Sequence, residues 1–199
     1  NYGLRGLGLR EATHNAITRT IGLHLSETLV VLAGEDERPN ADKFLMLFGE
    51  RADQIMADNT LIFPGVSEVL GELKSQGYTL GIVSTKYRYR IEDILGRHGL
   101  LEYFDNIVGG EDVKRHKPAP DSLLLSLENL KVNRQEAMYV GDSITDAMTA
   151  QAANVDFVAV LSGATQSGEF DAYPNSTILA GVDQDFLQYI VERNPDGNP

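Results

Sequence analysis

The chain contains no cysteine and no tryptophan among its 199 residues. Without cysteine it can form no disulfide, no thiolate metal site and no cysteine nucleophile. Basic side chains are also scarce, since 17 lysines and arginines stand against 29 aspartates and glutamates and leave a net charge of −12. Because nucleic-acid binding needs clustered positive charge, this balance argues against a nucleic-acid partner. No apolar run approaches the roughly 18 residues of a membrane-spanning helix, so we expect no membrane association either.

A chain of this length with 42% hydrophobic residues predicts one globular domain, or one domain with a small insertion. The lack of cysteine fits a cytoplasmic location. The N-terminal part shows helical spacing of its apolar residues, with a helix capped by Ser26 and ended by Gly34, then a solvated loop at Glu35–Glu37. The turn sequence Asn59–Gly65 ends this region, so we expect a helical domain at residues 1–62.

Short apolar segments alternate with helical ones from Pro64 onward. This alternation is typical of right-handed crossovers and of a parallel sheet with helices on both faces. We therefore predict an α/β protein whose core, at residues 63–193, is a three-layer Rossmann-like parallel sheet, followed by a disordered tail at 194–199. The predicted strands are residues 78–83, 106–108, 137–140, 156–161 and 177–179.

Small and polar residues follow the predicted strands. In an open parallel sheet, ligands bind beyond the carboxyl ends of the strands. Ser84-Thr85-Lys86 follows the first strand, Gly109–Asp112 the second, Gly141–Asp146 the third and Ser162–Thr165 the fourth. Hydroxyl, ammonium and carboxylate groups can thus converge on one crevice, where they suit a phosphate held together with a divalent cation such as Mg²⁺.

Each of these segments also has a structural interpretation. Ser84-Thr85 and Asp142-Ser143 can cap the N-termini of the helices that follow them. Asp142 and Asp146 are four residues apart, so on a helix they would share one side and repel unless a cation or solvent offset their charges. Lys117 lies in the stiff segment His116–Pro120, which either directs the lysine inward or leaves it in an exposed loop.

The combination of these segments is more specific than any one of them. An apolar strand followed by Ser84, then Lys117-Pro118, then a strand followed by Gly141-Asp142-Ser143-x-x-Asp146 resembles the haloacid dehalogenase superfamily of hydrolases. Phe63-Pro64-Gly65-Val66 and Lys117-Pro118-Ala119-Pro120 are similar to its phosphoglycolate phosphatase-like branch, in which a helical cap precedes this region. The resemblance covers essentially the whole chain.

The resemblance implies a role for each matching residue. Ser84 would bind the transferring phosphoryl group, with Thr85 beside it. Lys117 would offset the phosphate charge and position the nucleophile, while Asp142 would bind Mg²⁺ and Asp146 would support that site. The implied reaction is the magnesium-dependent hydrolysis of a small phosphate monoester, similar to phosphoglycolate, through an aspartyl-phosphate intermediate. The implied partner is therefore a small phosphorylated metabolite.

The superfamily's nucleophile is absent from the sequence. It is the first Asp of a strand-ending Asp-x-Asp-x-Thr motif, whereas Asp183-Gln184-Asp185 is better explained as a helix N-cap with an acidic first turn. We expect a further N-terminal segment of about 15–25 residues that carries the nucleophile and the first, central strand of the sheet. The resemblance also implies that the cap would select the substrate, with Thr20 and Gly22 as contacts.

Four other functions stay open. A natural loss of the motif would leave a metabolite-binding protein of the same fold without catalysis. A pyrophosphatase or phosphomutase of the same superfamily would use the same residues, and a dehalogenase would need no magnesium. Oligomeric state cannot be read from the sequence.

Overall fold

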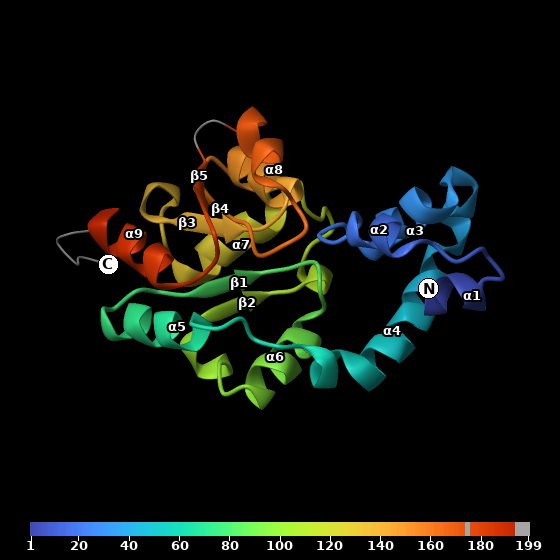
Figure 1. Ribbon diagram of the computed structural model, residues 1–199, viewed down its shortest axis with the longest axis horizontal. Helices are drawn as coiled ribbons and strands as arrows, with labels where there is room; N and C mark the ends of the chain where they lie inside the picture. Colours follow the sequence, from blue (N-terminus) through green and yellow to red (C-terminus); the bar gives the residue numbers. More distant parts are fainter. Residues whose placement is uncertain (174–175, 194–199) are drawn as a thin grey trace. The chain divides into compact units, whose positions relative to one another are not determined.

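The computed structural model describes residues 1–173 and 176–193, so the predicted disordered tail at 194–199 lies outside the described residues. The chain divides after Thr60 into two compact units. Unit 1 is Asn1–Thr60, drawn in blue to cyan in Figure 1, and unit 2 begins at Leu61. That unit 1 is a cap and unit 2 a catalytic core stays a prediction.

Unit 1 is helical, and its short helices pack on one long helix. Leu4, Leu29 and Phe44 form its buried centre, which joins α1 and α3 to α4. The elements are α1 (Tyr2–Gly6), α2 (His14–Thr18), α3 (Leu25–Ala33), the 3₁₀ helix η1 (Glu35–Asn40) and α4 (Ala41–Asn59).

Two local predictions for unit 1 are wrong. The residue that caps α3 is His24, whose ring accepts a hydrogen bond from the N–H of Ser26, so Ser26 lies inside the helix. The predicted loop at Glu35–Glu37 is the start of η1. Arg38 accounts for this order, because its guanidinium pairs with the carboxylates of Glu35 and Glu27.

Unit 2 alternates helices with short parallel strands. The strand pairs among its described residues are all parallel, and they form two groups, β1 with β2 and β3 with β4 and β5. The elements are α5 (Val66–Ser75), β1 (Gly81–Val83), α6 (Arg88–Arg97), η2 (Leu101–Tyr103), β2 (Asn106–Val108), η3 (Gly110–Asp112), α7 (Asp121–Leu130), η4 (Arg134–Glu136), β3 (Met138–Gly141), α8 (Ile144–Ala153), β4 (Asp156–Val160), η5 (Ser167–Ala172), β5 (Thr177–Leu179) and α9 (Gln184–Arg193).

Helices cover both faces of these strands, which gives three layers (Figure 1). On one face, α7 and α8 pack on a core that contains Tyr139 of β3 and Val83 of β1. On the other face, α5 and α9 pack against Val140 of β3 and Leu80, while α6 packs against Ile82. The predicted α/β, Rossmann-like fold class is therefore confirmed. Val83 of β1 and Tyr139 of β3 lie in one core, and Leu80, just before β1, lies in the other with Val140 of β3. No strand pairing joins β1 to β3 within the described residues.

Asp105 stabilises the segment around Leu80, which leads into β1. Its carboxylate accepts hydrogen bonds from Nζ of Lys74 at 2.7 Å and from the N–H of Leu80 at 2.9 Å. Partial burial would raise the pKa of Asp105, but the hydrogen bonds from Lys74 and Leu80 outweigh it and lower this pKa. The ionised carboxylate therefore stabilises the folded state.

We expect Asp105→Asn to lower the free energy of unfolding by about 1 kcal/mol at neutral pH. The contribution of Asp105 is present above its unfolded-state pKa and is lost as the pH falls through the lowered folded-state pKa. Urea unfolding of both proteins across the acid range measures this difference. It should shrink below the ordinary pKa of 3.8, and a constant difference would contradict the role of the charge.

None of the helices in the described part of the chain combines the length and apolar character needed to cross a membrane.

Candidate active site

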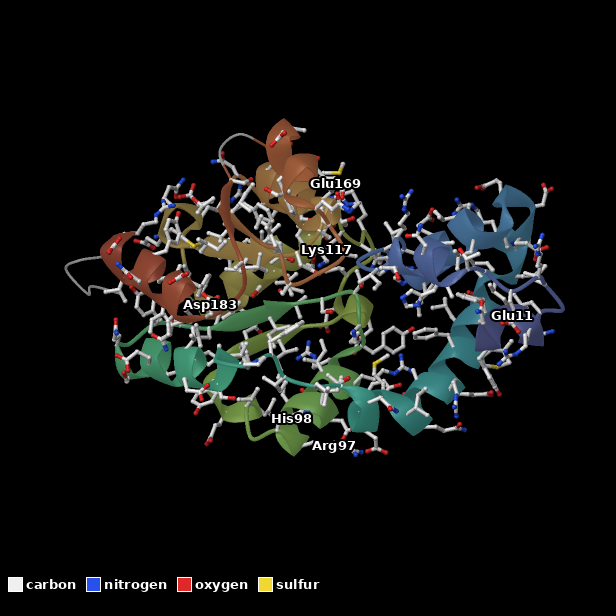
Figure 2. The ribbon with its side chains drawn as sticks, viewed as in Figure 1. Glu11, Arg97, His98, Lys117, Glu169 and Asp183 are labelled. Atoms are coloured by element: carbon white, nitrogen blue, oxygen red, sulfur yellow. The ribbon has the colours of Figure 1, made fainter. Side chains whose placement is uncertain are left out.

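A buried ion pair between Lys117 and Asp146 lies at the centre of the site. Nζ of Lys117 is 2.6 Å from Oδ1 of Asp146, and the two side chains are only 9% and 6% exposed. Lys117 precedes α7 and Asp146 lies in the first turn of α8, so tertiary packing joins residues 29 positions apart. Figure 2 labels Lys117, which lies in unit 2 on the segment that leads into α7. Of the two interpretations that the sequence leaves open for Lys117, the structure supports the one in which it points inward.

Hydrogen bonds occupy both oxygens of Asp146. The Tyr139 hydroxyl donates to Oδ1 at 2.9 Å, and the N–H and hydroxyl of Ser143 donate to Oδ2 at 3.2 and 2.5 Å. Burial would raise the pKa of Asp146, but Lys117, Ser143 and Tyr139 outweigh it and lower this pKa. Asp146 is therefore an ionised carboxylate that holds Lys117 and the start of α8.

Ser143 and Asp146 together form a capping box at the N-terminus of α8. The N–H of Asp146 donates to Oγ of Ser143 at 3.2 Å, and the Asp146 carboxylate accepts from the backbone of Ser143 in return. The structural interpretation of Ser143 as an N-cap is thus correct. Asp142 lies outside the helix, in the turn after β3, so the helical spacing that would put Asp142 and Asp146 on one side does not apply here.

Asp142 is a carboxylate of the site whose charge is only partly compensated. Burial and the charge of Asp146 raise the pKa of Asp142, and Lys117 and Lys86 offset this only in part. A carboxylate in this position gains from a nearby cation, and carboxylate oxygen is a preferred ligand of Mg²⁺.

The described residues fit a magnesium ion only in part. They contain no group of three or more histidine, cysteine or acidic side chains that could hold a metal. Magnesium is commonly held by one or two carboxylates, with waters and substrate phosphates completing its coordination. Asp142 therefore fits as one ligand of Mg²⁺, and the oxygens of Asp146 are already taken by Tyr139, Lys117 and Ser143.

The turn after β1 carries the predicted phosphate-binding residues. The N–H of Ser84 donates to the carbonyl of Val108 at 3.0 Å, and Oγ of Ser84 accepts from the N–H of Lys86 at 3.1 Å. Helix α6 begins at Arg88 with Tyr87 as its N-cap, so Ser84-Thr85 does not cap it and that structural interpretation is wrong.

Lys86 connects this turn to the rest of the site. Neighbouring protein atoms exclude water from its ammonium and lower the pKa of Lys86; the charge of Asp142 opposes this effect, and the charge of Lys117 adds to it. These interactions bring the Ser84 turn, Lys117 and Asp142 into one region, at the carboxyl ends of β1 and β3. The sequence identifies Lys86 as a cation beside Ser84 and Thr85 but predicts no role for it.

Tyr139 is the site residue that sequence reasoning missed. The sequence places it in a strand and gives it no function. Along β3, however, Tyr139 faces the core under α7 and α8, whereas Met138 and Val140 face the core under α5 and α9. This two-residue alternation is the signal that would have separated Tyr139 from its apolar neighbours.

Thr20 and Gly22 lie in unit 1, in the turn that follows α2. Thr20 is 5% exposed, and its hydroxyl donates to the carbonyl of Ile17 at 2.7 Å. Gly22 has a φ of +94°, a conformation that favours glycine. Both residues thus have a local structural role, and their contact with a substrate stays a prediction.

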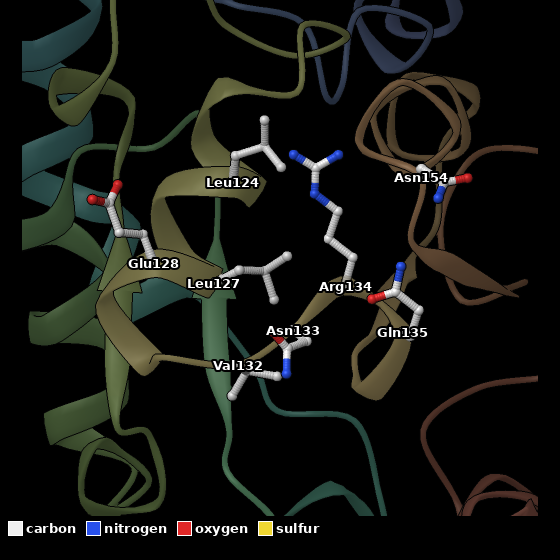
Figure 3. A pocket seen from close by; sticks show the side chains of 8 residues that line it. All are labelled: Leu124, Leu127, Glu128, Val132, Asn133, Arg134, Gln135 and Asn154. Atoms are coloured by element: carbon white, nitrogen blue, oxygen red, sulfur yellow. The ribbon is translucent and has the colours of Figure 1, made fainter.

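A separate hollow of about 610 Å³ lies at the other end of β3 (Figure 3). None of the predicted site residues lines it. One guanidinium nitrogen of Arg134 donates to the carbonyl of Ala153 at 3.1 Å, so this cation neutralises the C-terminus of α8. Arg134 is therefore explained by helix capping. The lining residues are Leu124, Leu127, Glu128, Val132, Asn133, Arg134, Gln135 and Asn154.

Residues 1–160 match the family model of haloacid dehalogenase-like hydrolases. The chain belongs to this family. It is 30% identical over 172 residues to a phosphoglycolate phosphatase of Nitrosococcus oceani, a match that covers 85% of this chain and 75% of that one. It is also 34% identical over 117 residues to the phosphoglycolate phosphatase of Escherichia coli, but this match covers 59% of the chain and only 46% of that relative.

A solved structure shows the same fold. The haloacid dehalogenase-like hydrolase of Bacteroides fragilis is 42% identical, with a TM-score of 0.87 over 92% of this chain and 87% of that one. The resemblance to the haloacid dehalogenase family, and to its phosphoglycolate phosphatase-like branch, is therefore confirmed.

Gly163, in the loop after β4, lies against Asp142, the residue that fits as a ligand of Mg²⁺. A methyl group on Gly163 would overlap the carboxylate of Asp142. Because Gly163 is exposed, we expect Gly163→Ala to displace Asp142 with little loss of stability, and to lower magnesium-dependent turnover about tenfold or more.

A magnesium titration of turnover measures the effect of Gly163→Ala, which should raise the concentration needed for half-maximal rate. The matched control is Gly168→Ala, because that exposed position has its nearest atom 4.0 Å away. Equal magnesium requirements in the two variants would show that Asp142 is not displaced or does not bind the metal.

Proposed function

We propose that the complete protein is a phosphatase that hydrolyses a small phosphate monoester with the help of Mg²⁺. The observation that carries this proposal is the buried pair of Lys117 and Asp146, next to Asp142, whose charge is only partly compensated. These groups lie where the carboxyl ends of β1 and β3 approach each other, the place where open parallel sheets bind ligands. The names of the relatives favour phosphoglycolate or a similar ester of a small acid as the substrate.

The residues divide the work as follows. The hydroxyl of Ser84, with Thr85 beside it, binds an oxygen of the phosphoryl group. The ammonium of Lys117, held in place by Asp146, offsets the negative charge that the reaction redistributes over these oxygens. Asp142 holds Mg²⁺, which when bound neutralises further phosphate charge. Because Lys117 is fixed before the substrate arrives, its charge stabilises the transition state without reorganisation.

The nucleophile is proposed to come from a further strand. An aspartate on this strand would attack phosphorus, break the ester P–O bond with release of the alcohol, and form an aspartyl-phosphate. Water would then hydrolyse this intermediate to inorganic phosphate and the free carboxylate. Two features support this. Among the described strands, β1 and β3 each have a single paired neighbour, and Val83 of β1 packs on the same core as Tyr139 of β3. In addition, the one Asp-x-Asp sequence of the chain, Asp183-Gln184-Asp185, is an N-cap: the carboxylate of Asp183 accepts from the N–H groups of Asp185 and Phe186.

The same geometry serves a binding protein or a phosphomutase. A turnover screen of phosphate esters separates these functions, using full-length protein with Mg²⁺ and with a chelator. Magnesium-dependent release of inorganic phosphate supports the phosphatase. Phosphate binding without release would identify a binding protein, and transfer to a sugar hydroxyl without release would identify a mutase. A cytoplasmic location and the absence of a nucleic-acid partner stay predictions.

A further inference from the structure

The segment that follows β2 holds the turn that follows β1. The N–H of Gly110 donates to the carbonyl of Lys86 at 2.8 Å, and Oε1 of Glu111 accepts from the N–H of Arg88 at 2.8 Å. Oδ1 of Asp112 lies 2.6 Å from a guanidinium nitrogen of Arg88. Three consecutive residues of one segment thus bond the last residues of the Ser84–Arg88 turn.

The two segments are packed without space between their backbones. A methyl group on Gly110 would lie 2.6 Å from the carbonyl oxygen of Thr85, and one on Gly109 would lie 2.6 Å from the backbone nitrogen of Arg88. Both glycines are buried. Close approach of the two backbones therefore requires glycine at both positions, and it leaves the turn little room to move.

Asp112 stabilises the conformation of the segment Gly109–Asp112, which we call the clamp. Oδ2 accepts from the N–H of Gly109 at 2.7 Å while Oδ1 faces Arg88. Partial burial would raise the pKa of Asp112, but the hydrogen bonds from Arg88 and Gly109 outweigh it and lower this pKa. The Asp112 carboxylate therefore stabilises the Gly109–Asp112 segment and binds Arg88, the last residue of the turn, at the same time.

The start of α6 is capped from a distance. Tyr87 is the N-cap of α6 and its side chain makes no cap hydrogen bond. Free N–H groups in the first turn of a helix need an acceptor, and negative charge is stabilising there. Glu111, 23 positions away, supplies both to the N–H of Arg88. A side chain next to α6 in sequence could also accept a hydrogen bond from its first N–H groups. The acceptor Glu111 in addition connects the turn before α6 to the segment that follows β2.

We propose that Glu111 and Asp112 are positioning residues, which hold the turn of Ser84, Thr85 and Lys86 in the conformation that presents its hydroxyl and ammonium groups to a phosphoryl group. The catalytic part of this proposal rests on the proposed function. Misplacement of a positioned group by about 1 Å can lower a rate by about 100-fold, so loss of the clamp should act on turnover. It should act less on substrate affinity, which Lys117 also supports.

Glu111→Ala and Asp112→Ala test the clamp in the full-length protein. We expect each to lower kcat about tenfold with KM changed less than about twofold, and to speed hydrogen–deuterium exchange in the peptide from Ser84 to Arg90. Glu111→Gln keeps an oxygen that can accept from the N–H of Arg88, so it should restore most of kcat. Asp93→Ala is the control, because it removes an exposed ion pair with Arg97 on the same helix and should change neither quantity.

The outcomes separate this proposal from the proposed function. An active wild-type protein with unchanged exchange in both alanine variants overturns the clamp, and faster exchange with unchanged kcat overturns the positioning role. If an alanine variant does not fold, Asp112→Asn carries the test, with an expected loss of kcat of about threefold and no loss contradicting the proposal. A wild-type protein without turnover overturns the proposed function, and the positioning role with it.

Discussion

Lys117→Ala is expected to lower the free energy of unfolding by about 3–5 kcal/mol. In the wild type the Asp146 side chain is 6% exposed and its carboxylate lies 2.6 Å from the Lys117 ammonium. The substitution leaves this carboxylate buried without the ammonium. Tyr139 and Ser143 still donate to Asp146, which favours the lower end of this range. Turnover of the full-length protein should also fall at least about 100-fold, since the fixed charge next to the phosphoryl group is lost. Urea unfolding and an ester turnover assay measure the two effects.

Two further variants separate the structural from the catalytic effect. Lys117→Ala combined with Asp146→Asn removes the uncompensated charge, so it should recover part of the stability and none of the turnover. Lys74→Ala is the matched control, because its ion pair with Asp105 is at the surface, with side chains 29% and 41% exposed. Its cost should be no more than about 1 kcal/mol. If Lys117→Ala cost no more than this control, the pair would not be buried in solution.

The positions of most strands follow from short-range pattern. β2 and β5 have the predicted bounds, β3 is shifted by one residue at both ends, and β4 is one residue shorter than predicted. The agreement is close because runs of apolar residues between turn signals leave few alternatives. The first strand was predicted from residue 78 and begins at Gly81. The N–H of Tyr78 closes the turn after α5 by donating to Leu73, and the N–H of Leu80 donates to the Asp105 side chain. The second of these bonds comes from a residue 25 positions away, which local pattern cannot show.

In the candidate site, too, some residues follow from short-range pattern and others depend on tertiary packing. Ser84, Lys117 and Asp142 could be chosen from the sequence because each lies beside a strand end or a rigid proline segment, and topology brings such places together. The capping box of Ser143 and Asp146 is also a local signal. The clamp at Glu111 could not be predicted, because the pattern suggested that Ser84-Thr85 caps α6 itself. Capping by a carboxylate 23 positions away depends on how β1 and β2 pair.

Asp142→Asn is expected to have opposite effects on activity and on stability. Burial and the nearby charge of Asp146 raise the pKa of Asp142, so ionised Asp142 destabilises the folded protein above its unfolded-state pKa. Removing the charge should therefore leave the metal-free protein at least as stable as the wild type near pH 7. Turnover should nevertheless fall at least about 100-fold, because the carboxylate proposed to hold Mg²⁺ is gone.

Magnesium itself provides the sharper measurement for Asp142→Asn. An ion that binds only the folded state stabilises it by about 2.7 kcal/mol at 100 times its dissociation constant. We expect the wild-type protein to gain unfolding free energy with added Mg²⁺ and Asp142→Asn to gain almost none. Asp156→Asn is the control of equal charge change, because Asp156 pairs with Arg193 at the surface of β4 and should leave the gain intact. The same gain in all three proteins would place the magnesium site elsewhere. If metal-free Asp142→Asn were less stable than the wild type, the fold would already compensate the charge of Asp142. Asp142 would then be a structural residue, and its charge would not need a bound cation.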